Sequence, residues 1–220
     1  MRLESRNLPK LPEWVKTHGD KIGRVSLFIK DIETMSQANL DVYKASLDEI
    51  VAWLPEFVEG NALELSFLTD RLILNEPNHC EAGVKNLTLS LDGRFYLCPG
   101  FMYDDPEKNA LTDLDTVLKT HEVPIKNKQL LKLDHAPICE NCDAYQCRRC
   151  VWLNKKTTLE VNTPSRQQCV MAHLERNASR DLIEPLYVGD LVQIAEIDYL
   201  DPFDELMKKK QPKGEKVDEC

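Results

Sequence analysis

In the first 75 residues, some segments have the hydrophobic periodicity of a helix and others that of a strand. Apolar side chains recur at helical spacing from Leu40 to Leu54, after a polar start at Ser36 to Asn39, and predict a helix of about four turns. The segments Arg24 to Lys30 and Leu63 to Phe67 predict buried strands on either side of it, and Pro12 to His18 is expected to end a short helix. Strand, helix and strand at this length predict a parallel βαβ unit.

The pattern changes near residue 76, where residues 76–78 have the sequence of a turn. Alternating apolar residues then lead into Asp92-Gly93 and resume up to Cys98. An Asp-Gly pair between such segments predicts a β-hairpin with positive φ at both turn residues. Its second strand is expected to end at Cys98.

Residues 99–137 are rich in loop sequence, with short helical candidates at 113–119 and 127–133. Thr163-Pro164 places a capping hydroxyl before a proline, so we expect a helix to begin there and continue through Cys169. The charged residues 208–220 lack periodicity and are expected to be disordered.

The fold class expected from this pattern is mixed, with an α/β element followed by an α+β arrangement. An α/β unit spans residues 1–75, an irregular cysteine-rich unit with a β-hairpin spans residues 76–185, and a C-terminal extension spans residues 186–220. The βαβ unit has too few strands to close a barrel.

The chain has 220 residues, of which 42% are hydrophobic, and is long enough to bury a core. Its net charge is −9, and only the first thirty residues are basic, which argues against nucleic-acid binding. No segment approaches the roughly 18 apolar residues of a membrane span, and the N-terminal sequence lacks the apolar stretch of a signal peptide. We therefore expect a cytoplasmic protein that binds neither nucleic acid nor membrane.

In a reducing compartment the eight cysteines are thiols and are free to bind metal. Four of them lie in the polar sequence CENCDAYQCRRC, from Cys139 to Cys150. Unrelated buried cysteines, each a small hydrophobe, would not gather in such a stretch. Thiolates are soft ligands for zinc or iron–sulfur iron, and a CxxC pair brings two sulfurs to one metal centre.

Only four residues separate the two CxxC pairs, whereas zinc ribbons usually separate theirs by about 15 to 20 residues. A cluster is larger than one ion, and a continuous loop can wrap around it. The spacing therefore favours an iron–sulfur site, with zinc as the alternative.

The whole cysteine pattern resembles the SPASM domain at the C-terminus of many radical SAM enzymes that modify peptides and proteins. In that domain a cysteine, a spacer, a glycine, four residues and a second cysteine precede a cysteine quartet and a final cysteine. Here Cys80, twelve residues, Gly93, four residues and Cys98 fit this opening. The last two gaps of the quartet are each one residue shorter than is typical of the family, and Cys169 closes the set.

The sequences CPGF (98–101), CRRCVWLN (147–154) and EVNTPSRQQC (160–169) resemble maturases of Cys-x-x-x (CXXX) repeat peptides within that group. The resemblance implies that residues 1–75 are the last βα units of a radical SAM partial barrel. It also implies that residues 76–185 are a SPASM-type domain with two auxiliary 4Fe-4S clusters. By the family's pairing, the ligands would be Cys139, Cys142, Cys147 and Cys169 for one cluster, and Cys80, Cys98 and Cys150 for three irons of the other.

Seven thiolates are one short of two full clusters, so one iron would bind a substrate group or a residue such as His79, which is otherwise an ordinary loop residue. His173 lies one helical turn from Cys169 and is a candidate donor to a cluster sulfur, a candidate zinc ligand, or a surface residue. His135 is a candidate ligand only because it lies near the cysteine quartet in the sequence. Cys220 lies outside the motif and is expected to be a free thiol.

Two sets of arginines have two interpretations each. Arg148 and Arg149, between cluster ligands, either offset the negative charge of a cluster or are solvated. Arg166, Arg176 and Arg180 form either a polar groove for a peptide or a solvated helix face.

A radical SAM enzyme needs a CxxxCxxC loop whose cluster chelates S-adenosylmethionine, and no cysteine precedes Cys80. This polypeptide alone is therefore not expected to be active, and S-adenosylmethionine would bind only in an N-terminal half outside this sequence. One hypothesis is that the chain is the auxiliary-cluster part of a maturase that modifies a ribosomally made precursor peptide. A second is a stand-alone metal-binding module that recruits the peptide or passes electrons to a separate radical SAM core chain. A zinc-stabilised structural domain is the third.

Overall fold

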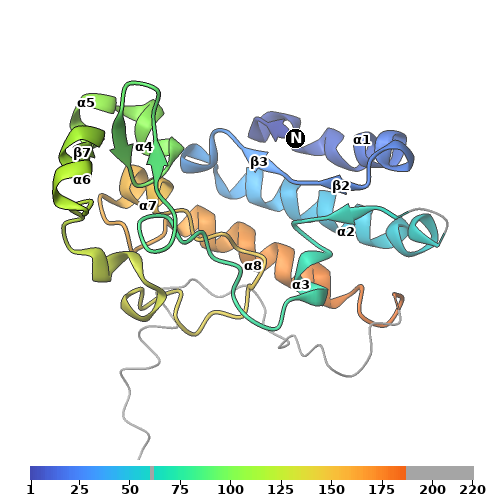
Figure 1. The fold of residues 1–220 in the computed structure, drawn as a ribbon. Coiled ribbons are helices and arrows are strands. Elements are labelled where there is room, and N and C mark those ends of the chain that lie inside the picture. The colour runs from blue at the N-terminus through green and yellow to red at the C-terminus, as the bar shows by residue number, and fades with distance from the viewer. Residues whose placement is uncertain (60–61, 187–220) are drawn as a thin grey trace, which may run out of the picture.

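A computed structural model of the chain describes residues 1–59 and 62–186, and it combines helices with small sheets (Figure 1). The segment 208–220, including Cys220, lies outside the described residues. The elements of the first half are β1 (Arg2–Leu3), η1 (Ser5–Lys10), α1 (Leu11–His18), η2 (Gly19–Lys21), β2 (Arg24–Val25), β3 (Phe28–Ile29), η3 (Ile32–Thr34), α2 (Gln37–Val58), β4 (Glu64–Leu65) and α3 (Asp70–Ile73). The later elements are β5 (Thr88–Leu89), β6 (Arg94–Tyr96), α4 (Pro99–Asp104), α5 (Pro106–Asn109), β7 (Thr112–Asp113), α6 (Leu114–Thr120), η4 (Lys128–Leu131), η5 (Leu133–His135), α7 (Val151–Thr158) and α8 (Arg166–Arg180).

Helix α2 confirms the long helix predicted from the apolar periodicity, and it is longer than expected. Ser36 and Asn39 form a capping box: the Ser36 hydroxyl accepts from the Asn39 N–H at 3.3 Å, and Asn39 Oδ1 accepts from the Ser36 N–H at 3.0 Å. The buried apolar stripe consists of Leu40, Tyr43, Leu47, Ile50 and Leu54. The helix is thus fixed by local signals at its start and by burial along one face.

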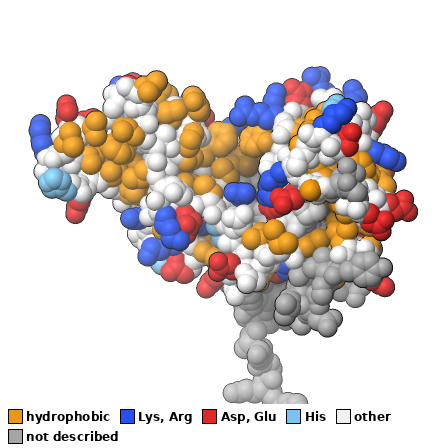
Figure 2. Space-filling view, turned by 45° about the vertical axis from the view of Figure 1, so that its right-hand side comes forward, with side chains coloured by type: hydrophobic (Ala, Val, Ile, Leu, Met, Phe, Trp, Pro, Cys, Tyr) orange, Lys and Arg blue, Asp and Glu red, His pale blue; other side chains and the backbone are white. Residues whose placement is uncertain are grey.

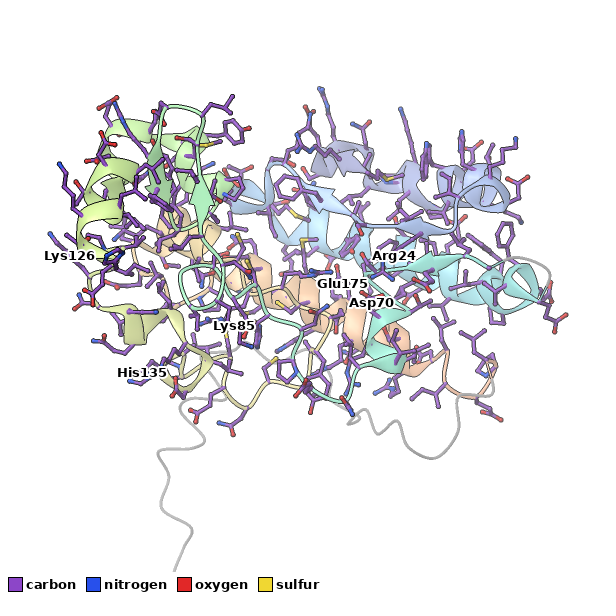
Figure 3. All side chains as sticks on the ribbon, in the orientation of Figure 1. Arg24, Asp70, Lys85, Lys126, His135 and Glu175 are labelled. Carbon is purple, nitrogen blue, oxygen red and sulfur yellow. The ribbon has the colours of Figure 1, made fainter. Side chains whose placement is uncertain are left out.

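The parallel βαβ unit is also confirmed, because β2 and β4 pair in parallel and α2 connects them. The single strand predicted over Arg24 to Lys30 is wrong, since β2 ends at Val25 and β3 is a separate strand that pairs in parallel with β1. Hydrogen bonding to the N-terminal residues divides the segment between two sheets. Arg24 on β2 also donates to Asp70 at the start of α3, at 2.8 Å, and the two side chains lie together in Figure 3.

The predicted hairpin forms from β5 and β6, which pair antiparallel, and β7 adds a third strand. Gly93 has a φ of 82°, but Asp92 is not among the residues with positive φ, so the expectation for Asp92 is wrong. The Gly93 N–H donates to the Ser90 carbonyl at 3.0 Å, and the Ser90 N–H donates to the Arg94 carbonyl at 2.9 Å, so the loop consists of three residues, Leu91 to Gly93, and not of two. Strand β6 ends at Tyr96, and Cys98 lies beyond it as the N-cap residue of α4.

Helix α8 begins at Arg166 and not at Thr163-Pro164 as predicted. The reason is a second capping box, in which the Ser165 hydroxyl accepts from the Gln168 N–H at 3.3 Å and Gln168 Oε1 accepts from the Ser165 N–H at 2.8 Å. The reciprocal pair satisfies two backbone donors, which a threonine two residues earlier would not do.

Helix α8 packs along α2 and supplies part of the main hydrophobic core (Figure 1). Val170, Met171 and Ala178 of α8 join that core, which otherwise comes from the first 72 residues and Leu182. A smaller core under the cysteine-rich part contains Ala82, Phe101, Leu131 and Val151. The last helix of the predicted second unit is therefore built into the core of the first.

Within the described residues, no helix is long and apolar enough to cross a membrane. Hydrophobic side chains gather on the surface of the lobe that contains the hairpin (Figure 2). The exposed large apolar residues of this lobe are Leu87, Leu89, Leu91, Tyr103, Leu114 and Leu118.

Candidate metal centre

Four cysteines line one small cavity of about 30 Å³. They are Cys139, Cys142 and Cys147, from the loop between η5 and α7, and Cys169, from the first turn of α8. His173 closes one side: it is only 4% exposed, and its Nε2 lies 3.4 Å from the Cys142 Sγ. The surface interpretation of His173 is therefore wrong, and the residue contacts a candidate ligand.

Burial keeps two thiols of this cavity, those of Cys139 and Cys147, protonated in the absence of a cation. It raises the pKa of Cys147 to about 12 and that of Cys139 to about 11. A neutral thiol is a poor nucleophile, so the arrangement does not favour a catalytic cysteine. A bound metal deprotonates a coordinating thiol outright, which makes ligation the chemistry suited to these groups.

The other three cysteines form a second group. Burial raises the pKa of Cys98 and of Cys150, and the nearby Cys80 thiol adds to both shifts. Cys98 and Cys150 are the N-cap residues of α4 and α7, and backbone N–H groups in the first turns of these helices oppose the rise in pKa. These N–H groups also favour the anionic form that a metal ligand takes.

Close packing of α4 on α7 holds the second group together. A Cβ added to Gly100 of α4 would lie 2.6 Å from the Cγ atom of Trp152 in α7. The glycine of the CPGF sequence thus allows Trp152 to approach the α4 backbone. Because Cys98 and Cys150 begin these two helices, the contact fixes the positions of both thiols.

Backbone hydrogen bonds place the two groups next to each other. The Asn78 N–H donates to the Tyr145 carbonyl at 2.9 Å, and the Cys80 N–H donates to the Arg148 carbonyl at 2.8 Å. The segment before the hairpin therefore lies along the cysteine loop. Cys80 joins the second group at the point where the loop passes from Cys147, in the first group, to Cys150, in the second.

No protein-family model matches the chain, and no curated protein matches it. Among residues 1–59 and 62–186, no three His, Cys, Asp or Glu side chains converge at the spacing that holds one metal ion. The ligand roles of the seven cysteines stay predictions, for iron–sulfur and for zinc alike. Their donor chemistry fits an iron–sulfur centre, because each group consists of thiols that are half-buried and reduced.

His79, which the sequence offered either as one candidate ligand of the iron left open by Cys80, Cys98 and Cys150 or as an ordinary loop residue, lies at the four-thiol cavity. Both of its ring nitrogens are buried without a hydrogen-bond partner in the described structure. Burial, with a smaller contribution from Arg149, lowers its pKa to about 4, so the ring is neutral. His135 is exposed, lies at the periphery in Figure 3, and has its Nδ1 2.9 Å from Asp134 Oδ1.

Burial in the structure distinguishes three of the arginines considered above. Arg148 is exposed, whereas Arg149 is only 4% exposed. Arg176 is 1% exposed and pairs with Asp143 in the cysteine loop, so it belongs neither to a groove nor to a solvated face. Long-range packing of α8 against the loop buries it, and the helix pattern alone does not reveal this.

A cleft of about 250 Å³ lies between the first half and the cysteine loop. Leu27, Ser66 and Phe67 line it just beyond the carboxyl ends of β2 and β4, and Cys147 and Cys150 line the opposite part. In open α/β sheets, ligands bind at the carboxyl ends of the strands. The cleft therefore lies at the edge where ligands bind in such sheets, and it is next to both thiol groups.

Glu175 also lines this cleft, although no sequence pattern points to it as a site residue. The Tyr43 hydroxyl donates to Glu175 Oε1 at 2.7 Å, and Gln146 Nε2 lies 3.5 Å from Oε2 (Glu175 is labelled in Figure 3). Tyr43 and Glu175 are 132 residues apart, so no local pattern connects them. Burial raises the pKa of Glu175 to about 7, against the opposite effect of these two hydrogen bonds.

Glu175→Gln should stabilise the chain at pH 8 and flatten the pH dependence of its stability. Between the usual pKa of 4.5 and about 7, the folded state keeps a proton on Glu175 that the unfolded state has lost. Stability therefore falls as pH rises through this range, and glutamine removes about 1–3 kcal/mol of that loss while its side-chain oxygen still accepts from Tyr43. Urea unfolding of the anaerobically purified chain between pH 5 and 8 measures the effect, with exposed Glu140→Gln as the control. Parallel curves for the wild type and Glu175→Gln would contradict the prediction.

Proposed function

We propose that this chain is the auxiliary iron–sulfur portion of a radical SAM maturase that modifies a ribosomally made CXXX repeat peptide. The observation that carries the proposal is the division of seven thiols into a group of four around one cavity and a group of three, two of which lie at helix starts. The parallel βαβ unit beside them supports a link to a radical SAM barrel.

In this proposal, Cys139, Cys142, Cys147 and Cys169 hold one 4Fe-4S cluster, and Cys80, Cys98 and Cys150 hold three irons of the other. Such clusters supply one-electron transfer. The chain's own residues orient the ligands: His173 contacts Cys142, and the first turns of α4 and α7 direct N–H groups at Cys98 and Cys150. Burial of both groups limits the access of water and oxygen to the site.

The precursor peptide is proposed to bind in the cleft next to Cys147 and Cys150. Its lining combines apolar side chains such as Phe67 and Met171 with the carboxyl group of Glu175 and the amide of Gln146. An apolar surface with a few polar groups is typical of sites that orient a ligand. The radical would come from a core that carries CxxxCxxC, which this sequence lacks.

A stand-alone module that serves a separate core chain is the second candidate. One observation favours it: α8 completes the hydrophobic core of the first half, so the core of the first half includes a helix of the cysteine-rich unit. A neighbouring reading frame that encodes barrel-like βα units with CxxxCxxC would show where the core resides. A short neighbouring gene with repeated Cys-x-x-x would identify the substrate.

Metal analysis after anaerobic purification tests the proposal. We expect about eight irons and eight labile sulfides per chain, with an absorption spectrum that bleaches on reduction with dithionite. One zinc per chain without labile sulfide would contradict the proposal and support a zinc-stabilised domain. Aerobic treatment provides the control, since it should destroy the clusters but leave a zinc site intact.

A further inference from the structure

Arg149 is the buried residue at the junction of the two thiol groups. It lies between Cys147 and Cys150 in the sequence and lines both the four-thiol cavity and the cleft. Its backbone φ is 38°, in the left-handed region that non-glycine residues rarely adopt. A strained backbone that buries an arginine persists only where the surrounding structure requires it.

Backbone carbonyls hold the Arg149 guanidinium in place. Its Nη1 donates to the Lys132 carbonyl at 3.3 Å, and its Nη2 donates to the Leu131 carbonyl. The Nε atom is buried without a hydrogen-bond partner in the part of the chain that the structure describes. Two neutral carbonyls fix the position of the charge but do not neutralise it, so burial is costly unless anionic groups lie nearby.

Cysteines of both groups lie near Arg149, which shares the four-thiol cavity with Cys139 and Cys147 and the cleft with Cys147 and Cys150. Cys139 and Cys147 belong to the first group and Cys80 to the second, and all three favour the charged guanidinium, whereas burial lowers its pKa. Metal ligation turns these thiols into thiolates, and an iron–sulfur cluster with its thiolates is anionic. The guanidinium would then have anions on two sides.

We propose that Arg149 is a positioning residue that acts as the shared counter-charge of the two clusters and raises the midpoint potentials of both. This inference rests on the proposed function, since it requires clusters at the two thiol groups. Each cluster gains negative charge on reduction, so a nearby fixed cation stabilises the reduced form and raises the potential. A residue that serves both clusters shifts both potentials in the same direction, unlike a residue that contacts only one.

Redox titration with dithionite and mediators, followed by electron paramagnetic resonance of the loaded chain, tests the inference. Arg149→Gln should lower the midpoint potentials of both clusters. Arg149→Lys, which keeps the charge, should leave both close to the wild-type values. Arg148→Gln is the matched control, because it removes an adjacent but exposed cation, and it should shift neither potential appreciably.

The inference is overturned if Arg149→Gln shifts one potential only or neither, or if Arg148→Gln shifts both as much. If Arg149→Gln fails to load clusters, Arg149→Lys decides: loading with wild-type potentials supports a role for the charge. If Arg149→Lys also fails to load clusters, the role of Arg149 is to bind the Leu131 and Lys132 carbonyls, and the inference is overturned. Absence of clusters from the wild-type chain would instead refute the proposed function. Metal analysis of the wild type, done before any variant is made, detects that outcome.

Discussion

Replacing Cys142 by alanine should halve the iron and labile sulfide content of the chain, from about eight to about four of each. Cys142 lines the four-thiol cavity and contacts His173, whereas the thiols of Cys80, Cys98 and Cys150 lie in the other group. Loss of one thiolate should therefore remove one cluster and leave the other. Iron and sulfide assays together with electron paramagnetic resonance of the reduced chain measure the result.

Two further variants make this test specific. Cys80→Ala should remove the other cluster, so its remaining resonance signal should differ from that of Cys142→Ala. Cys220→Ala lies outside the cysteine pattern and should keep the full iron content. If Cys142→Ala and Cys80→Ala each abolish both clusters, the thiols do not form two independent sites, and the division of ligands is wrong.

Replacing Arg176 by methionine should lower the free energy of unfolding by about 3 to 5 kcal/mol. The Arg176 side chain is 2% exposed, and its Nη1 pairs with Asp143 Oδ1, which lies between Cys142 and Cys147 in the loop. Its Nε and Nη2 both donate to Asn177 Oδ1 at 3.2 Å. Methionine removes the ion pair with Asp143 and with it the contact that ties the loop to α8. Anaerobic denaturant unfolding measures the change.

Arg180→Met is the control for this prediction, because Arg180 lies on the same helix and is half-buried. Its Nε is 3.5 Å from Asp181 Oδ1, a pair of the kind that contributes little in water. We expect its substitution to change stability by about 0.5 kcal/mol or less. An Arg176→Met variant as stable as Arg180→Met would show that the buried pair does not hold the loop.

Local signals predicted the parts of the fold that local interactions decide. The periodicity from Leu40 to Leu54 predicted α2, and Asp92-Gly93 predicted the hairpin, although only Gly93 takes positive φ. The start of α8 was misplaced because Thr163-Pro164 and Ser165 are both plausible caps, and the choice depends on Gln168. The strand over residues 24–30 was predicted as one because its division depends on pairing with β1.

In the candidate site, too, only the features that local sequence determines could be predicted. The cysteines could be chosen as candidate metal ligands from the sequence, because their close spacing in a polar loop is a local signal. The burial of His173 and Arg176, and the contact between Tyr43 and Glu175, arise where α8 passes between the first half and the loop. These contacts join residues far apart in the chain, and single-sequence patterns carry no information about them.

The double role of α8 has a consequence for the order of events during synthesis. Val170, Met171 and Ala178 complete the core of the first half, and Cys169 on the same helix is the last of the seven thiols to be made. Until the ribosome has released this helix, the first half exposes apolar surface and the four-thiol cavity lacks one wall. The core and the cavity are therefore completed at the same stage of synthesis. A nascent chain stalled before α8 would have neither a complete core nor a complete four-thiol cavity.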